Sequence, residues 1–223
     1  LVLMFDKNPQ GALGWTSVER GDGVSASING TAANGASTQL STAYGFGDFQ
    51  TSAGDVRVAR PVAIAETAGG ASDQAAIVRV RQAGSDSLAV TFYRVDDLSG
   101  TIGGLHPEDT GYVAAIAARA YQLAGGGTSL AGPGYGNFAQ TALLHVNAGD
   151  IIAMQLTDVS QGGVYSAFAA ANETVGGQKV GHLWNYGLNT WGWEDTWGGG
   201  DRDYNDLVVG LDFTSAAGHG YLV

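Results

Sequence analysis

The stretch that decides the fold reads Ala75-Ala-Ile-Val-Arg-Val-Arg-Gln82, then Ala-Gly-Ser-Asp, then Ser87-Leu-Ala-Val-Thr-Phe-Tyr-Arg-Val95. In its first part Val78 and Val80 alternate with Arg79 and Arg81, which is the period-two pattern of a strand with one buried face. The last part is apolar and rich in β-branched and aromatic residues, and a run of turn-forming residues separates the two. The stretch therefore predicts two strands of antiparallel sheet with one solvated face.

The same pattern recurs on both sides of this stretch. Strands are expected at 55–66, 138–146, 150–157, 163–170 and 206–213, and the apolar start at 1–5 suggests one more. Segments rich in Gly, Ser, Asn and Asp separate these strands. The pattern predicts a mainly β chain, an antiparallel β-sandwich of jelly-roll-like type, folded as a single domain over residues 1–223.

One segment departs from the strand pattern. Residues 107–124 are rich in helix formers, and Tyr112, Ile116 and Ala120 lie on one helical stripe. Glycines at 125–127 would end the helix. We therefore expect one α-helix near 109–124, followed by a flexible loop through Gly136.

Composition excludes several classes of function. Acidic residues outnumber basic ones 21 to 10, giving a net charge of −11, which argues against nucleic-acid binding and docking on anionic lipid. No apolar run approaches the roughly 20 residues that a membrane-spanning helix needs. Cysteine is absent, which excludes disulfides, thiolate metal sites and a cysteine nucleophile. A bacterial surface protein can use calcium in place of disulfides, so the lack of cysteine is compatible with secretion.

The segment 182–213 carries the most information about function. Six acidic side chains lie between 194 and 212, with only Arg202 opposing them, and such crowding is unfavourable unless a cation gathers the carboxylates. The opening spacing of an EF-hand loop occurs at 201–205 but the match fails beyond it, so a different oxygen-ligand site is predicted. The expected calcium ligands are Glu194, Asp195, Asp201, Asp203, Asn205 and Asp206. The alternative is an Asx-rich turn that caps a hairpin without an ion.

The same segment concentrates aromatic residues. A sugar-stacking platform could be built from Trp184, Trp191, Trp193, Trp197 and Tyr204, because aromatic rings pack against the apolar face of a pyranose. The alternative is that these rings close one end of the sandwich core. A second acidic pair, Asp96-Asp97, ends a predicted strand and is expected to form a turn, with a second calcium site as the alternative.

Signals for enzymatic activity are weak. The chain has no Gly-x-Ser-x-Gly motif, no P-loop and no dinucleotide-binding glycine motif. Glu194 and Asp195 could be a glycosidase pair, but adjacent residues on a strand point to opposite faces. The chain is therefore expected not to be an enzyme, with a secreted hydrolase as a weak alternative.

One motif resembles a known family. Residues 193–209, Trp-Glu-Asp-Thr-Trp-Gly-Gly-Gly-Asp-Arg-Asp-Tyr-Asn-Asp-Leu-Val-Val, resemble the signature of a bacterial domain-of-unknown-function family. That family occurs near the C-termini of large calcium-binding proteins exported by type I secretion. Residues 92–100 and 111–115 resemble a stretch that accompanies it, and the uncharged apolar tail 213–223 is similar to the tails of such substrates. The first 85 residues carry no resemblance.

The resemblance implies a bacterial protein that is secreted or lies at the cell surface. Together with the acidic segment, it leads us to expect a non-enzymatic, calcium-binding extracellular module that serves surface attachment or self-assembly. The alternative is a calcium-dependent, lectin-like carbohydrate-binding module. Expected partners are extracellular polysaccharide or copies of the chain itself, with no nucleic acid and no insertion into a membrane.

Overall fold

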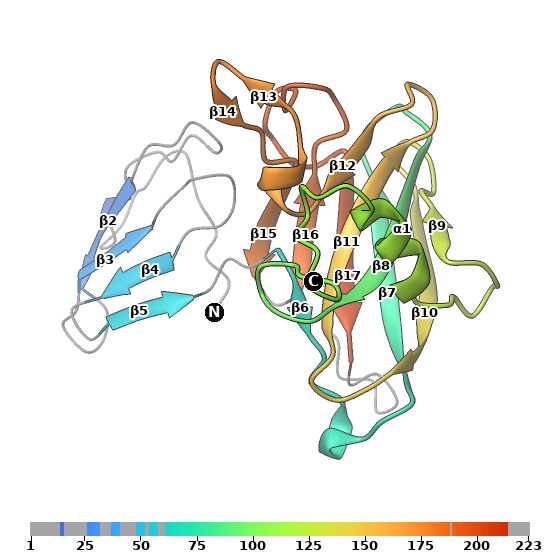
Figure 1. Cartoon of the computed structure of the whole chain (residues 1–223). Coiled ribbons are helices and arrows are strands. Elements are labelled where there is room, and N and C mark those ends of the chain that lie inside the picture. Colours follow the sequence, from blue (N-terminus) through green and yellow to red (C-terminus); the bar gives the residue numbers. More distant parts are fainter. Residues whose placement is uncertain are drawn as a thin grey trace.

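The computed structural model describes residues 61–187 and 189–213, together with the backbone of five short strands between Gly14 and Arg57. Among the residues described at 61–187 and 189–213, strands make up 43% and helical turns 9%, so the fold is mainly β, as predicted. In Figure 1 two antiparallel sheets stand against each other over residues 61–213. The apolar segments 1–5 and 221–223 lie outside the described residues.

Sheet I has five strands. In spatial order they are β10 (Phe138–Val146), β7 (Gln74–Gln82), β17 (Leu207–Asp212), β16 (Thr190–Trp193) and β15 (Leu183–Gly187). Every neighbouring pair is antiparallel. The last strand of the described residues, β17, therefore lies in the middle of its sheet.

Sheet II faces sheet I. It contains β12 (Val164–Ser166), β11 (Ile151–Asp158), β8 (Leu88–Val95) and β9 (Ser129–Ala131), with β6 (Ala63–Ile64) paired to β11. Outside both sheets are the hairpin of β13 (Thr174–Val175) and β14 (Gln178–Lys179) and the 3₁₀ turns η2 (Ala68–Gly70) and η3 (Ala169–Ala171). Between β7 and β17 the chain crosses from one sheet to the other four times.

The core lies between the two sheets. On β7 the buried side chains Val78 and Val80 alternate with the more exposed Arg79 and Arg81, as the sequence predicted. Sheet II contributes Phe92, Met154 and Leu156, among others, to the same buried cluster. Burial of such side chains, at about 25 cal/mol per Å² of apolar surface, holds the two sheets together.

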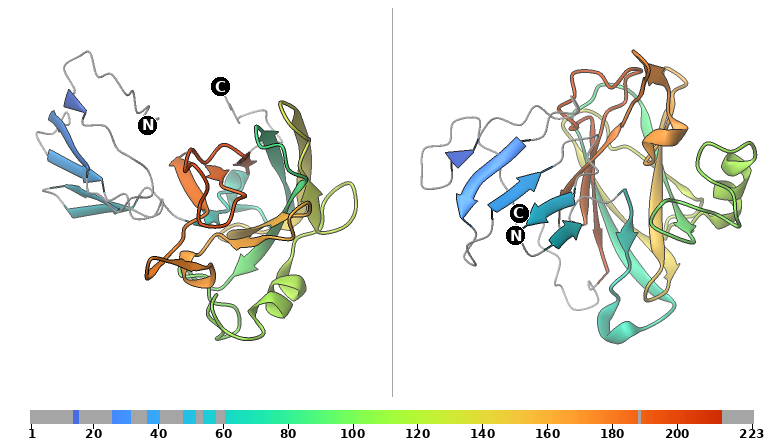
Figure 2. Two further views of the ribbon diagram at one scale, coloured as in Figure 1. Left: turned by 90° about the horizontal axis from the view of Figure 1, so that it is seen from above. Right: turned by 60° about the vertical axis from the view of Figure 1, so that its left-hand side comes forward.

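The α-helix predicted near 109–124 is shorter in the structure. Helix α1 (Tyr112–Arg119) lies on the outer face of sheet II (Figure 2). There the rings of Tyr112 and Tyr93 pack edge to face, with their centroids 6.3 Å apart. Beyond the helix the backbone is extended, because the Tyr121 N–H bonds the Phe92 carbonyl and the Ala124 N–H bonds the Ala142 carbonyl, both at 2.9 Å. Pairing with both sheets thus overrides the helix propensity of residues 120–124. The loop expected through Gly136 likewise contains a strand, β9.

A third sheet lies in the N-terminal part of the chain. It orders β1 (Gly14–Trp15), β2 (Ala26–Thr31), β3 (Ser37–Leu40), β4 (Asp48–Thr51) and β5 (Gly54–Arg57) as they occur in sequence, all antiparallel. The strand predicted at 55–66 is thus two strands, β5 and β6. The single domain over 1–223 stays a prediction. No helix within the described residues has the length and apolar character to cross a membrane.

Candidate metal centre

Three carboxylates meet in the loop that connects β16 to β17. Glu194, Asp201 and Asp203 each place one oxygen so that all three lie within 4.8 Å of one another. The strand register holds the ends of the loop together, because Trp193 at the end of β16 pairs with Leu207 at the start of β17. This group could hold a metal ion.

The buried member of the group is Glu194, whose exposed fraction is 1%. One of its carboxylate oxygens accepts the Tyr204 N–H at 2.5 Å. Burial raises the pKa of Glu194 to about 7, against the effect of that hydrogen bond, and the charges of Asp206, Asp201 and Asp203 raise it further. A bound cation would remove this penalty, because it would compensate the charge that burial disfavours.

The loop backbone is shaped to bring these groups together. Gly200 has a φ of +47°, and a Cβ there would lie 2.5 Å from a Glu194 carboxylate oxygen, so a larger residue would collide with the site. Arg202 and Tyr204 also adopt the left-handed conformation, at φ 61° and 54°. Non-glycine residues rarely adopt it, and here it is concentrated at the acidic group.

The other three predicted ligands lie differently. Asn205 is exposed, and its backbone N–H donates to Asp203 at 3.1 Å while its side-chain amide also donates to the Asp203 carboxylate. Asp195 and Asp206 turn away from Glu194 toward Gly84, where oxygens of both lie 2.9 and 3.1 Å from the position of an added Cβ. The opposite orientation of Glu194 and Asp195 is the one expected for adjacent residues on an extended chain.

Most of the predicted sugar platform is buried. Trp184, Trp191, Trp193 and Tyr204 have exposed fractions of 4% or less, so the prediction that they bind a glycan at the surface is wrong for these four. Trp191 and Trp193 are buried because β16 directs them into the core between the two sheets. Trp184 pairs with Gly192 and so lies on the other face of sheet I, where its ring centroid is 5.8 Å from that of Tyr204. Trp197, in the loop, is 66% exposed.

A contact between buried His182 and Glu173 supports the loop, and the sequence did not predict it. The His182 ring is stacked on Tyr165, with the ring centroids 3.9 Å apart. Its Nδ1 lies 2.9 Å from the Glu194 carbonyl oxygen, and its Nε2 lies 2.9 Å from Oε1 of Glu173. Glu173 also accepts the Gly198 N–H at 2.6 Å. Although desolvation opposes it, the bonds from Gly198 and His182 hold the pKa of Glu173 below its usual value. No spacing in the sequence links these residues, since the β13–β14 hairpin brings them together.

Two other acidic residues have structural roles. Asp97 accepts the N–H groups of Ser99 and Thr101 at 2.9 and 3.1 Å, so the expected turn after β8 is confirmed. The side-chain and backbone hydrogen bonds from Thr101, with others from Ser99, hold the pKa of Asp97 well below its usual range. Asp212 pairs with Arg79 at 3.4 Å at the far end of β17.

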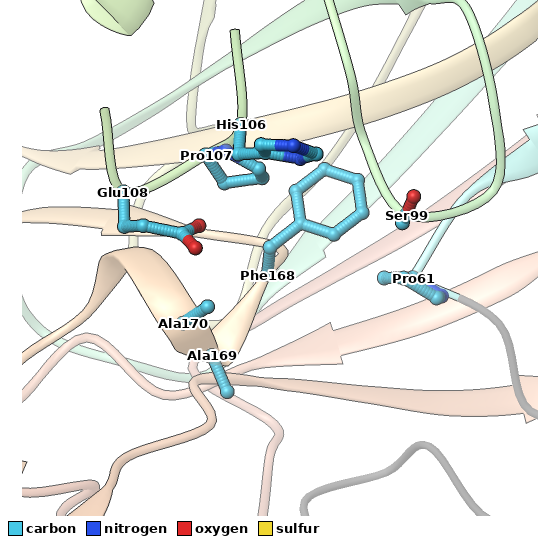
Figure 3. A pocket seen from close by; sticks show the side chains of 8 residues that line it. All are labelled: Pro61, Ser99, His106, Pro107, Glu108, Phe168, Ala169 and Ala170. Atoms are coloured by element: carbon cyan, nitrogen blue, oxygen red, sulfur yellow. The ribbon is translucent and has the colours of Figure 1, made fainter. Parts of the chain in front are cut away.

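A surface cavity of about 360 Å³ lies apart from the acidic loop. Figure 3 shows the rings of His106 and Phe168 close together on its wall, with the Glu108 carboxylate beside them. Pro61, Ser99, Pro107, Ala169 and Ala170 complete the lining. None of the predicted metal or glycan residues belongs to it.

Comparison with known families gives one match. Residues 141–214, about a third of the chain, match the model described as Domain of unknown function (DUF4114). The match extends from β10 through β17 and includes the whole acidic loop. No curated protein and no solved structure matches the chain significantly.

Proposed function

We propose that this chain is a non-enzymatic calcium-binding module of a secreted or cell-surface bacterial protein. The observation that carries the proposal is the convergence of Glu194, Asp201 and Asp203, whose ligand oxygens lie within 4.8 Å in a loop shaped by left-handed residues. Calcium would order this loop and stabilise the sandwich.

Calcium is the cation that best suits this group. The donors are carboxylate oxygens, which favour hard cations over zinc or copper. Calcium accepts irregular geometries and six to eight ligands, whereas magnesium requires a near-ideal octahedron. Asp201 is exposed and Asp203 partly so, which leaves room for water molecules to complete the coordination.

The geometry does not favour Glu194 and Asp195 as a glycosidase pair. Glycosidases need two carboxyl groups that face one another across the substrate. Glu194 instead lies with Asp201 and Asp203, while Asp195 lies beside Asp206 on the other side of the chain. Secretion, surface attachment and self-assembly remain part of the proposal, supported by the family resemblance of residues 193–209 and by the absence of cysteine.

The first prediction is that calcium stabilises the folded chain through this group. We expect the Tm to be higher in millimolar calcium than in chelator, because the unfolded chain has no assembled site. The double variant Asp201→Asn with Asp203→Asn keeps the side-chain shapes and should lose the response. Glu66→Gln is the matched control, since Glu66 is exposed and lies beside η2, far along the chain from the loop. Equal Tm values for the wild type with and without calcium would refute the proposal.

A calcium-dependent carbohydrate-binding module is the second candidate. The observation that favours it is Trp197, which is exposed in the same loop and is the one described ring of the predicted platform free to stack on a sugar. Binding on a glycan array that disappears both with chelator and in Trp197→Ala would support this function. Binding unaffected by Trp197→Ala would exclude this site.

A further inference from the structure

Two buried carboxylate oxygens lack a hydrogen-bond partner. One is Oδ2 of Asp158, a residue with an exposed fraction of 0%, and the other is Oδ2 of Asp195, at 5%. The second oxygen of Asp158 is satisfied, since it accepts the N–H groups of Ser160 and Gln161 at 2.8 and 2.9 Å. Leaving a buried carboxylate oxygen unpaired is unfavourable, so each of these oxygens favours a proton or a cation beside it.

Both oxygens belong to one acidic group at the end of the sandwich. Asp195 is the second residue after β16 and Asp206 directly precedes β17, while Asp158 ends β11 and pairs with Leu88 at the start of β8. The turn between β7 and β8, which carries Asp86, closes the group, because the N–H groups of Ala83 and Gly84 both donate to the Asp206 carbonyl at 3.1 Å. Asp195 and Asp206 thus lie at the ends of strands of sheet I, Asp158 lies at the end of a strand of sheet II, and Asp86 lies in the turn that connects the two sheets.

Glycine at position 84 makes the approach possible. A Cβ there would lie 2.9 Å from Oδ2 of Asp195 and 3.1 Å from Oδ1 of Asp206, so any other residue would fill the space between the carboxylates. The Asp195 N–H donates to the other Asp206 oxygen at 3.1 Å and fixes the two side chains relative to each other.

The electrostatics of the group call for a positive charge. Among the ion pairs of the described residues, none joins Lys, Arg or His to any of these four carboxylates. Burial, followed by the charges of Asp86 and Asp158, raises the pKa of Asp195 against hydrogen bonds from Thr196 and Asp206. Burial likewise raises the pKa of Asp206 to about 7. Either a shared proton or a cation would relieve this repulsion.

We propose that Asp158, Asp195 and Asp206, with Asp86 at the rim, form a second calcium site that joins sheet I to sheet II. This site is distinct from the Glu194 group, because the adjacent side chains of Glu194 and Asp195 point to opposite sides of the extended chain. The oxygen donors again suit a hard cation, and the free Oδ2 atoms of Asp158 and Asp195 supply ligands that no hydrogen bond occupies. The carboxylates are more spread than in the first group, so binding would draw the two sheets together at this end.

The test is a calcium titration of the full chain by calorimetry at about pH 8, where unperturbed carboxyl groups are ionised. Asp158→Asn keeps an oxygen for the Ser160 and Gln161 N–H groups and replaces only the free oxygen. It should bind one calcium ion fewer than the wild type, as should Asp195→Asn, which serves if the first variant does not fold. Glu66→Gln should bind the wild-type number.

The two sites give separable outcomes. Asp201→Asn with Asp203→Asn should remove a different ion, so that combining it with Asp158→Asn removes both. Loss of an ion in Asp158→Asn alone supports the second site even if the first proves wrong. Unchanged calcium stoichiometry in both Asp158→Asn and Asp195→Asn would overturn the second site. If their Tm in chelator also rose above that of the wild type, the group would hold a shared proton instead.

Discussion

Glu194 and Asp195 are neighbours in sequence but lie in different surroundings. Glu194 faces the loop carboxylates Asp201 and Asp203, whereas Asp195 faces the junction of the two sheets at Gly84. Burial raises the pKa of both side chains. At the residue scale, therefore, charge that would destabilise an ion-free protein is placed on two sides of one short segment.

The variant Glu194→Gln tests this charge directly. The amide oxygen can still accept the Tyr204 N–H, so the loop should fold as before. Because the folded pKa of about 7 lies above the usual value of 4.5, ionisation destabilises the folded chain at neutral pH. Removing the charge should raise the free energy of unfolding in chelator by about 1 to 3 kcal/mol, while the calcium response of the loop falls. Urea denaturation with and without calcium measures both.

The opposite stability change in Glu194→Gln would contradict this prediction. A Glu194→Gln protein that is less stable than the wild type in chelator would show that the buried carboxylate is compensated by groups within the protein. Asp109→Asn, which changes an acidic residue before α1, gives the effect of removing a charge away from the loop.

At the scale of elements, the loop 194–206 depends on its contact with β16. A Cβ at Gly192 would lie 1.9 Å from the Tyr204 carbonyl oxygen, so the returning loop passes directly over this strand. The contact explains why a glycine stands between Trp191 and Trp193, on the face of β16 opposite to these two buried rings. Loop and strand therefore form one unit.

Gly192→Ala should force the loop 194–206 away from β16. Since the collision is with backbone, which cannot rotate away, we expect a loss of at least about 3 kcal/mol in the free energy of unfolding, at the upper end of single substitutions. The control is Gly125→Ala, where an added Cβ has no atom within 4 Å and which should change stability little. A Gly192→Ala protein with wild-type stability and calcium response would contradict the close approach.

The sequence predicted the strands in which apolar and polar residues alternate because one face of the strand is buried. Strands β7, β8, β10, β11 and β17 were predicted nearly at their bounds, because alternation follows from one buried face. Strands β15 and β16 were missed, since Asn, Gly and Thr stand between their tryptophans and the rings were as consistent with a surface platform as with the core. Residues 120–124 were predicted as helix because their pairing partners, Phe92 and Ala142, are distant in sequence.

At the scale of the whole molecule, buried acid makes stability depend on pH. The pKa values of Glu194 and Asp206 are both raised to about 7, above those of the unfolded chain. Between about pH 4 and 7 the folded protein therefore holds more protons than the unfolded one, and its stability falls as the pH rises through this range.

Calcium should offset the loss of folding stability at high pH. Ligand carboxylates must be ionised to bind the cation, so its affinity rises as they lose their protons. We expect the difference in Tm between calcium and chelator to be larger at pH 8 than at pH 5, as measured by thermal scans at matched ionic strength. An equal difference at both pH values would mean that these carboxylates do not bind the ion.

The sequence predicted the ligands of the first site but not Asp158 of the second, whose role depends on how the two sheets pack. Glu194, Asp201 and Asp203 were predicted as ligands because they crowd one short segment. Asp158 stands alone before Val159 and Ser160, where an aspartate ordinarily begins a turn, and it does accept the turn's N–H groups. Only the packing of sheet II against sheet I shows that its other oxygen is buried without a partner.

The central position of β17 has a consequence for the order in which the chain can fold. Strands β7 and β16 are both hydrogen-bonded to β17 and not to each other, so a growing chain that ends before residue 207 holds sheet I in two separate pieces. Joining them closes a long stretch of chain, which is a slow step. The acidic loop emerges immediately before the strand that completes the sheet. An ion that ordered this loop would therefore act at the last step of assembly, by holding the start of β17 beside β16 while the rest of the strand inserts.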